Sequence, residues 1–162
     1  QFWAITTHEI MKTFKKILLW SLVSFALIQF VPIDKVNKPI DRATNFVDVK
    51  KSPVKVKELL KRACYDCHSD ETVYPKYASI APLSWSIKNH VNEGRRRFNY
   101  SIWTTYDPYL KENIVDGTIQ ALKNKSMPLA GYLVYHDEAK LTDGERALLI
   151  AYFEDLQKTK SY

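Results

Sequence analysis

The pentapeptide Cys64-Tyr65-Asp66-Cys67-His68 constrains this chain more than any other feature. Two cysteines three positions apart, with a histidine directly after the second, form the attachment motif of a c-type haem. On a helical turn, positions i and i+3 share a face, so both thiols can reach the two vinyl groups of one porphyrin edge. The histidine is then carried under the ring, where its imidazole can ligate the iron. The motif therefore predicts haem c attached covalently through Cys64 and Cys67, with His68 as an axial ligand of the iron.

Other uses of a paired CxxC motif fit the sequence less well. A zinc site needs about four protein ligands, but the chain has only two cysteines and its other histidines, His8, His90 and His136, are widely scattered. A thioredoxin-type redox pair is expected at the start of a helix after a strand, whereas residues 53–63 before this motif have a helical pattern. A disulfide between cysteines so close together closes only a small loop and stabilises little. Haem attachment is thus the preferred interpretation.

An uncharged apolar run from Ile17 to Ile33 follows Lys12, Lys15 and Lys16. As a helix it would rise about 25 Å, near the lower limit for crossing a bilayer. Positive charge before the run predicts that the N-terminus lies in the cytoplasm and the remainder outside. Bulky residues follow the run in place of a small-residue cleavage site, which favours an uncleaved signal anchor. Because bacterial c-type haem is attached after export, the sequence predicts a domain on the periplasmic side of the inner membrane, held by a single-pass N-terminal anchor.

The length of 162 residues suits one domain plus an extension. We predict a leader and signal anchor over residues 1–33, a linker over 34–52 and a c-type haem-binding domain over 53–162. The first ten residues precede Met11, which looks like a natural start, and we treat them as an extra leader. The formal charge of +6 is modest and does not indicate nucleic-acid binding.

The spacing of apolar residues predicts helices and no strands. Ser52-Pro53 and Asp107-Pro108 each look like an N-cap followed by proline at the first helical position. Thr142 and Glu145 form a capping box that opens the last helix. Apolar residues recur at helical spacing through the expected helices, which are residues 53–63, 82–97, a helix from residue 108 and another from residue 143. The predicted fold class is all-α: a small cytochrome c-like helical domain preceded by an N-terminal transmembrane helix.

Several segments beyond the haem motif carry a resemblance to a known family. They are residues 64–72, 74–77, 80–85, 90–95, 99–103, 127–129, Tyr132 and 136–142. Over roughly residues 53–158 the chain resembles the small bacterial haem-binding domain, a relative of c-type cytochromes. The resemblance implies a periplasmic haem protein. The chain departs from the family pattern at Lys76, where the family tends to carry tryptophan.

The second axial ligand has three candidates in the soluble part, namely Met127, His90 and His136. Met127-Pro128 lies in a loop after two expected helices, as the distal methionine of class I cytochromes c does. A thioether favours ferrous iron and raises the reduction potential relative to two histidines. We therefore predict His68 and Met127 as the iron ligands. In one alternative, Met127 only fills core space. In the other, His90 is the ligand, whereas otherwise it forms a hydrogen bond with a haem carboxylate or the backbone.

Further residues are candidates to surround the haem. Aromatic side chains, Trp85 and Tyr77 foremost, can wall the porphyrin or simply pack in the core. Arg95, at the start of an arginine run, can neutralise a haem carboxylate or lie in solvent at a helix end. The predicted cofactor-binding residues are Cys64, Cys67, His68, Met127, Trp85, Arg95 and Tyr77.

The leading functional hypothesis is a membrane-anchored monohaem cytochrome that carries single electrons and is not an enzyme. The porphyrin does the redox chemistry, while the ligands and burial set its potential. Redox proteins of the periplasm or membrane are the expected partners. Two alternatives stay open: a peroxidase-like enzyme or gas or redox sensor with an open iron position, and a structural haem subunit of a larger respiratory complex.

Overall fold

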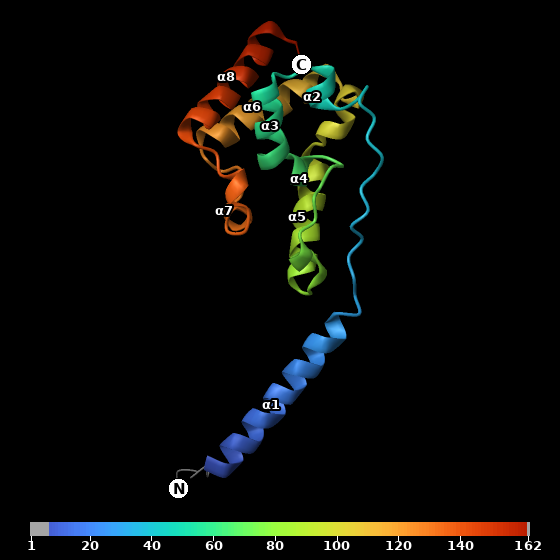
Figure 1. The fold of residues 1–162 in the computed structure, drawn as a ribbon, viewed down its shortest axis with the longest axis vertical. Helices are drawn as coiled ribbons and strands as arrows, with labels where there is room; N and C mark the ends of the chain where they lie inside the picture. The colour runs from blue at the N-terminus through green and yellow to red at the C-terminus, as the bar shows by residue number, and fades with distance from the viewer. Residues whose placement is uncertain (1–6, 162) are drawn as a thin grey trace. The chain divides into compact units, whose positions relative to one another are not determined.

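The computed structural model describes residues 7–161, and all regular elements in this range are helical (Figure 1). The longer helices are α1 (Thr7–Ile28), α3 (Val54–Ala63), α5 (Leu83–Arg97), α6 (Pro108–Lys123) and α8 (Asp143–Thr159). Single turns are α2 (Phe46–Val49), α4 (Tyr65–His68) and α7 (Ala130–Leu133), and 3-10 turns are η1 (Lys76–Ser79), η2 (Tyr100–Thr105) and η3 (Asp137–Ala139). The predicted all-α class is confirmed.

The chain divides into two compact units. Unit 1 comprises residues 1–35 and 75–88, and unit 2 comprises residues 36–74 and 89–162. Within unit 1, the side chain of Gln29 donates to the Ala81 carbonyl at 3.1 Å and accepts from the Ala81 N–H at 3.0 Å. The predicted boundaries at residues 34 and 53 stay predictions.

The structure does not support the predicted transmembrane helix. Helix α1 begins at Thr7, so Lys12, Lys15 and Lys16 lie inside it, and it ends at Ile28, short of Ile33. Its uncharged part therefore rises only about 18 Å, well short of a hydrocarbon core of about 30 Å. None of the helices in residues 7–161 is both long and apolar enough to span a bilayer. The leader's first six residues lie outside the described range.

The helix caps of unit 2 mostly follow the sequence prediction. The Asp107 carboxylate accepts from the Leu110 N–H at 2.8 Å at the start of α6, and Thr142 and Glu145 form the predicted capping box of α8. Ser52 is an exception, because Pro53 is the N-cap of α3 and the Ser52 hydroxyl pairs with that of Tyr152 at 2.8 Å. Helices α6 and α8 pack against each other, and α3 packs against α8 (Figure 1).

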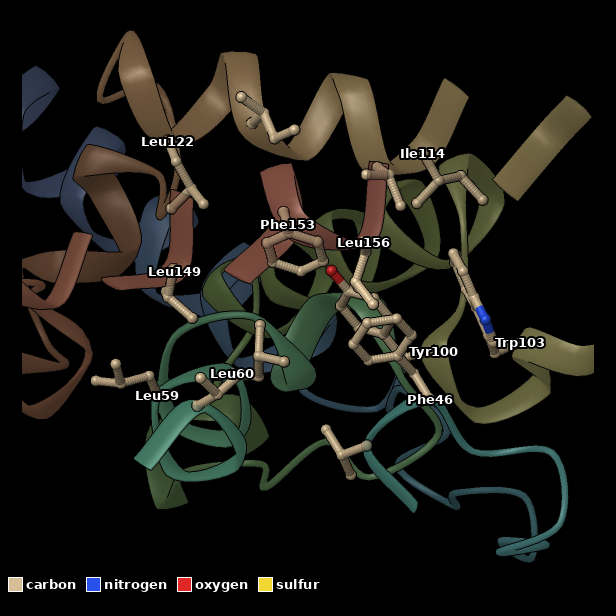
Figure 2. Packing of buried hydrophobic residues seen from close by; sticks show 14 of the residues in the cluster. Phe46, Leu59, Leu60, Tyr100, Trp103, Ile114, Leu122, Leu149, Phe153 and Leu156 are labelled. Atoms are coloured by element: carbon tan, nitrogen blue, oxygen red, sulfur yellow. The ribbon is translucent and has the colours of Figure 1, made fainter. Parts of the chain in front are cut away.

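An aromatic cluster fills the core of unit 2 around Phe46 (Figure 2). The centroid of the Phe46 ring lies 4.9 Å from that of Tyr100, 4.8 Å from that of Trp103 and 5.9 Å from that of Phe153. Phe46 is fully buried, so the predicted linker over residues 34–52 contains a central core residue. Its helix α2 is a single turn, too short for the apolar period to appear in the sequence.

Candidate functional site

The CYDCH motif forms a kinked helical turn in unit 2. Helix α3 ends at Ala63, Cys64 breaks the helical path with φ −127°, and α4 covers Tyr65–His68. The Cys64 carbonyl accepts from the His68 N–H at 2.9 Å and from the Cys67 N–H at 3.3 Å. Cys64 and Cys67 thus span one turn, as the sequence predicts, and both are free thiols of intermediate exposure.

Burial keeps both thiols protonated at neutral pH. Burial raises the pKa of Cys64 to about 12, and the neighbouring Cys67 adds a smaller effect. Burial also raises the pKa of Cys67 to about 11, and the negative charge of Asp66 acts in the same direction. A catalytic redox pair has a lowered thiol pKa, and zinc takes the thiolate. Residues 7–161 also contain no cluster of three or more His, Cys, Asp or Glu side chains suited to a metal ion. The raised thiol pKa values weaken the redox-pair alternative.

The surroundings of His68 favour a neutral imidazole that can ligate a metal. Its side chain is buried, and its ring stacks on Phe98 with centroids 4.1 Å apart and planes at 10°. Nδ1 lies 3.4 Å from the Phe98 carbonyl oxygen. A carbonyl only accepts, so this contact favours the tautomer with the hydrogen on Nδ1, which leaves the Nε2 lone pair for a metal. The Gly94 backbone also forms a hydrogen bond with this ring. Burial also lowers the pKa of His68, which favours the neutral, ligating form.

The two residues between the cysteines are both anchored to other parts of unit 2. The Tyr65 ring is buried, and its hydroxyl donates to Asn45 Oδ1 at 3.1 Å. Asp66 Oδ1 accepts from the Val73 N–H at 2.9 Å, and Asp66 Oδ2 accepts from the Tyr132 hydroxyl at 2.7 Å. The side chains of both residues between the cysteines therefore bind the motif to neighbouring segments of unit 2.

Helix α5 touches the backbone of the motif at Gly94. A Cβ on Gly94 would lie 2.3 Å from the Cys67 carbonyl oxygen and 2.8 Å from the Cys67 carbonyl carbon. Only glycine fits this approach. A glycine inside a predicted helix was a visible signal of such close packing, although the sequence did not show what lies opposite.

Arg95 binds the loop that leaves the motif. Its Nε donates to the Ser69 carbonyl at 2.7 Å, and one Nη donates to Thr72 Oγ1 at 2.9 Å and to Asn37 Oδ1 at 2.9 Å. The Asp70 carboxylate lies 3.5 Å from Arg95 Nε. Arg95 on α5 therefore binds the loop that follows His68. Its contact with a haem carboxylate stays a prediction.

Met127 lies in the loop between α6 and α7, where it is partly buried. Arg146 donates through one Nη to the Met127 carbonyl at 3.0 Å. Further along the same segment, Tyr132 makes the hydrogen bond to Asp66 inside the motif. The segment that carries Met127 is therefore fixed to α8 and to the haem motif. Its role as an iron ligand stays a prediction.

The other predicted residues are described within their own units. Tyr77 and Trp85 belong to unit 1, where Trp85 Nε1 donates to the Val31 carbonyl at 3.0 Å. His90 is exposed on α5. The His136 ring stacks on Tyr132 with centroids 4.1 Å apart, and its Nδ1 lies 2.7 Å from a Glu138 carboxylate oxygen. The walls predicted from Tyr77 and Trp85 stay predictions.

The donor set of unit 2 fits a covalently attached haem. Cys64 and Cys67 would bind its vinyl groups, and His68 would ligate its iron. Arg146 Nε is buried and has no acceptor among the described residues, so it is a spare cationic donor for an anionic group. Arg146 also lies close enough to Cys64 to lower the pKa of that thiol slightly, against the larger effect of burial. Sequence reasoning did not find Arg146, because its partners are backbone carbonyls.

A protein-family comparison gives an independent result. The model of a family described as a haem-binding domain matches residues 23–155, which is most of the chain. The match begins well before residue 53, where the resemblance noted in the sequence starts, and it includes the end of α1 and the segment with Phe46. No curated protein and no solved structure matches the chain.

Proposed function

This chain belongs to the family of haem-binding domains, and from that premise we propose that it is a monohaem c-type cytochrome that carries single electrons. The family match supports haem binding. Covalent attachment, ligation by a histidine and a methionine, and electron transfer are the proposal. The observation that carries it is the arrangement of the motif. Two free thiols span one turn, and directly after them comes a buried His68 whose Nδ1 faces a backbone carbonyl.

Each residue of the site has a part in this function. The thiols of Cys64 and Cys67 would each add across a vinyl double bond, an addition that uses the thiol hydrogen and needs no oxidant. The carbonyl of Phe98 orients His68, and the stacked Phe98 ring excludes water from one face of the imidazole. A bound haem supplies the one-electron change between ferric and ferrous iron. The soft thioether of Met127 would stabilise the ferrous state.

The compartment and partners follow from the attachment chemistry. Bacterial c-type haem is attached after export, which supports a periplasmic location for unit 2. The electron donor and acceptor would be redox proteins of the periplasm or membrane. A carrier of this kind needs no substrate pocket, because only an electron is transferred and a six-coordinate iron reorganises little.

The first experiment asks whether the haem is covalent and six-coordinate. The full chain would be produced together with a c-type haem attachment system, then extracted with acid-acetone and examined by ultraviolet-visible spectroscopy. We expect haem to stay with the chain and its ferric spectrum to be low-spin. Cys64→Ala with Cys67→Ala should release the haem, and His68→Ala should change the spin state. Tyr109→Phe, at an exposed position of α6, is the control and should do neither.

Two results would count against the proposal. Haem that extracts freely from the unaltered chain would contradict covalent attachment. A five-coordinate, high-spin ferric iron in the unaltered protein would favour an enzyme or sensor with an open iron position over an electron carrier.

A further inference from the structure

Arg146 joins the end of α6 to the loop that carries Met127. Its Nη1 donates to the Leu122 carbonyl at 3.1 Å and to the Met127 carbonyl at 3.0 Å. Leu122 lies in the last turn of α6, whereas Met127 lies in irregular backbone beyond it. A single guanidinium nitrogen therefore fixes the distance between a helix end and the backbone of the predicted iron ligand.

Arg146 itself is held rigidly. It lies in the first turn of α8, where its backbone N–H donates to the Thr142 carbonyl at 2.9 Å. The neighbouring Glu145 closes the capping box with Thr142 and pairs with Arg62 at 2.6 Å. The first turn of α8 is thus fixed by its cap and by an ion pair to α3, and it presents the guanidinium from a defined position.

Met127 follows closely after the end of α6. Lys125 has φ 53° there and closes the helix, because its N–H donates to the Leu122 carbonyl at 3.2 Å and the Ser126 N–H donates to the Ala121 carbonyl at 3.1 Å. A methionine side chain has three rotatable bonds and is flexible, and its sulfur carries no charge that would hold it on ferric iron. A ligand of this kind binds reliably only if its backbone is held in place.

We propose that Arg146 is a positioning residue: by holding the Met127 carbonyl, it keeps the Met127 thioether available as the sixth ligand of the haem iron. This role rests on the proposed function, because it presupposes a haem ligated by His68 and Met127. Arg146 does not touch the iron in this assignment, and its effect on the ligand passes through the Met127 backbone. The simpler alternative is that Arg146 only braces α6 against α8.

The chain offers a matched control for that alternative. Lys123 on α6 pairs with Glu154 on α8 at 2.7 Å, so it also bridges these two helices, but without touching the Met127 loop. Lys123→Ala removes a brace and leaves the carbonyl contact intact. Arg146→Ala removes the carbonyl contact, and Arg146→Lys keeps the charge while offering fewer donors in a different geometry.

The test uses the haem-loaded full chain. Ferric haem with methionine ligation shows a weak charge-transfer band in the red, which reports the ligand directly. We expect Arg146→Ala to lose most of this band and to bind cyanide more tightly by about 10- to 100-fold, the same size as the loss of metal affinity when an outer-shell partner is removed. Lys123→Ala should keep the band and the cyanide affinity of the unaltered protein.

Arg146→Lys keeps the test decisive if Arg146→Ala does not fold. On heating, the band of Arg146→Lys should fade at a lower temperature relative to global unfolding than the band of the unaltered protein. If both Arg146 variants keep the band and the cyanide affinity as Lys123→Ala does, Arg146 is only a brace and the positioning role is overturned. If the unaltered protein has no band, or Met127→Ala keeps it, the Met127 ligation in the proposed function is wrong, and the role of Arg146 falls with it.

Discussion

The hydroxyl of Tyr132 donates a hydrogen bond of 2.7 Å to Asp66, one of the two residues between the cysteines of the haem motif. The two residues are 66 positions apart in the sequence. Asp66 also accepts from the Val73 N–H, so both of its carboxylate oxygens are used by other segments. Burial, and after it the neighbouring Asp66 carboxylate, raise the pKa of Tyr132 above its ordinary range, so the phenol stays a donor at neutral pH.

Tyr132→Phe should therefore weaken the attachment of α7 to the motif. We expect the free energy of unfolding to fall by about 1–2 kcal/mol, since a part-buried hydrogen bond to a carboxylate is lost. Urea denaturation followed by circular dichroism measures this change. Tyr109→Phe is the matched control, because Tyr109 is 74% exposed on α6, and it should have almost no effect. Equal stability of the two variants would contradict the assigned contact.

Gly94→Ala should disturb the haem motif directly. The new methyl group would meet the Cys67 carbonyl, so α5 and the motif would have to move apart, and we expect a loss of about 1–3 kcal/mol of unfolding free energy. The yield of covalently attached haem should fall as well. Gly117→Ala has no heavy atom within 4 Å of its methyl group and should stabilise α6 by up to about 1 kcal/mol. Opposite signs for the two variants are the expected result.

The identity of the sixth ligand can be tested apart from the role of Arg146. Met127→Ala should lower the reduction potential and open the iron to carbon monoxide, because a soft donor that favours ferrous iron is removed. His90→Ala should change the potential little, since His90 is exposed on α5. Potentiometric titration and carbon monoxide binding check both. A high-spin iron in His90→Ala, with no change in Met127→Ala, would make His90 the ligand.

Acid should weaken the packing of α2. Burial alone would raise the pKa of Asp48, but hydrogen bonds from Asn45 and Lys57 outweigh it and lower the pKa from 3.8. Because the carboxylate form is favoured in the folded state, the stability it contributes is present above about pH 4 and is lost as the pH falls below that value. The unfolding free energy of the unaltered chain should drop more steeply between pH 5 and about pH 3 than that of Asp48→Asn. Parallel pH profiles would contradict this prediction.

The sequence was sufficient wherever structure is decided locally. The turn of the CYDCH motif, the Asp107 cap and the Thr142–Glu145 capping box all depend on residues within a few positions of one another. The burial of Phe46 and the contact of Arg146 with Met127 were not predictable, because they join segments distant in the sequence. The predicted bilayer-spanning helix lacks support for a different reason: an apolar run does not determine where a helix begins and ends, and α1 stops at Ile28.

The anchoring of Tyr65 and Asp66 bears on how freely this motif can be exchanged. The two spacer residues between the cysteines take no part in the attachment chemistry. By that chemistry alone, they could be substituted freely or replaced by those of another cytochrome. Here Tyr65 reaches Asn45 and Asp66 reaches Val73 and Tyr132. A foreign spacer would keep the chemistry and lose three tertiary contacts. The sequence freedom of this site is therefore limited by the fold around it.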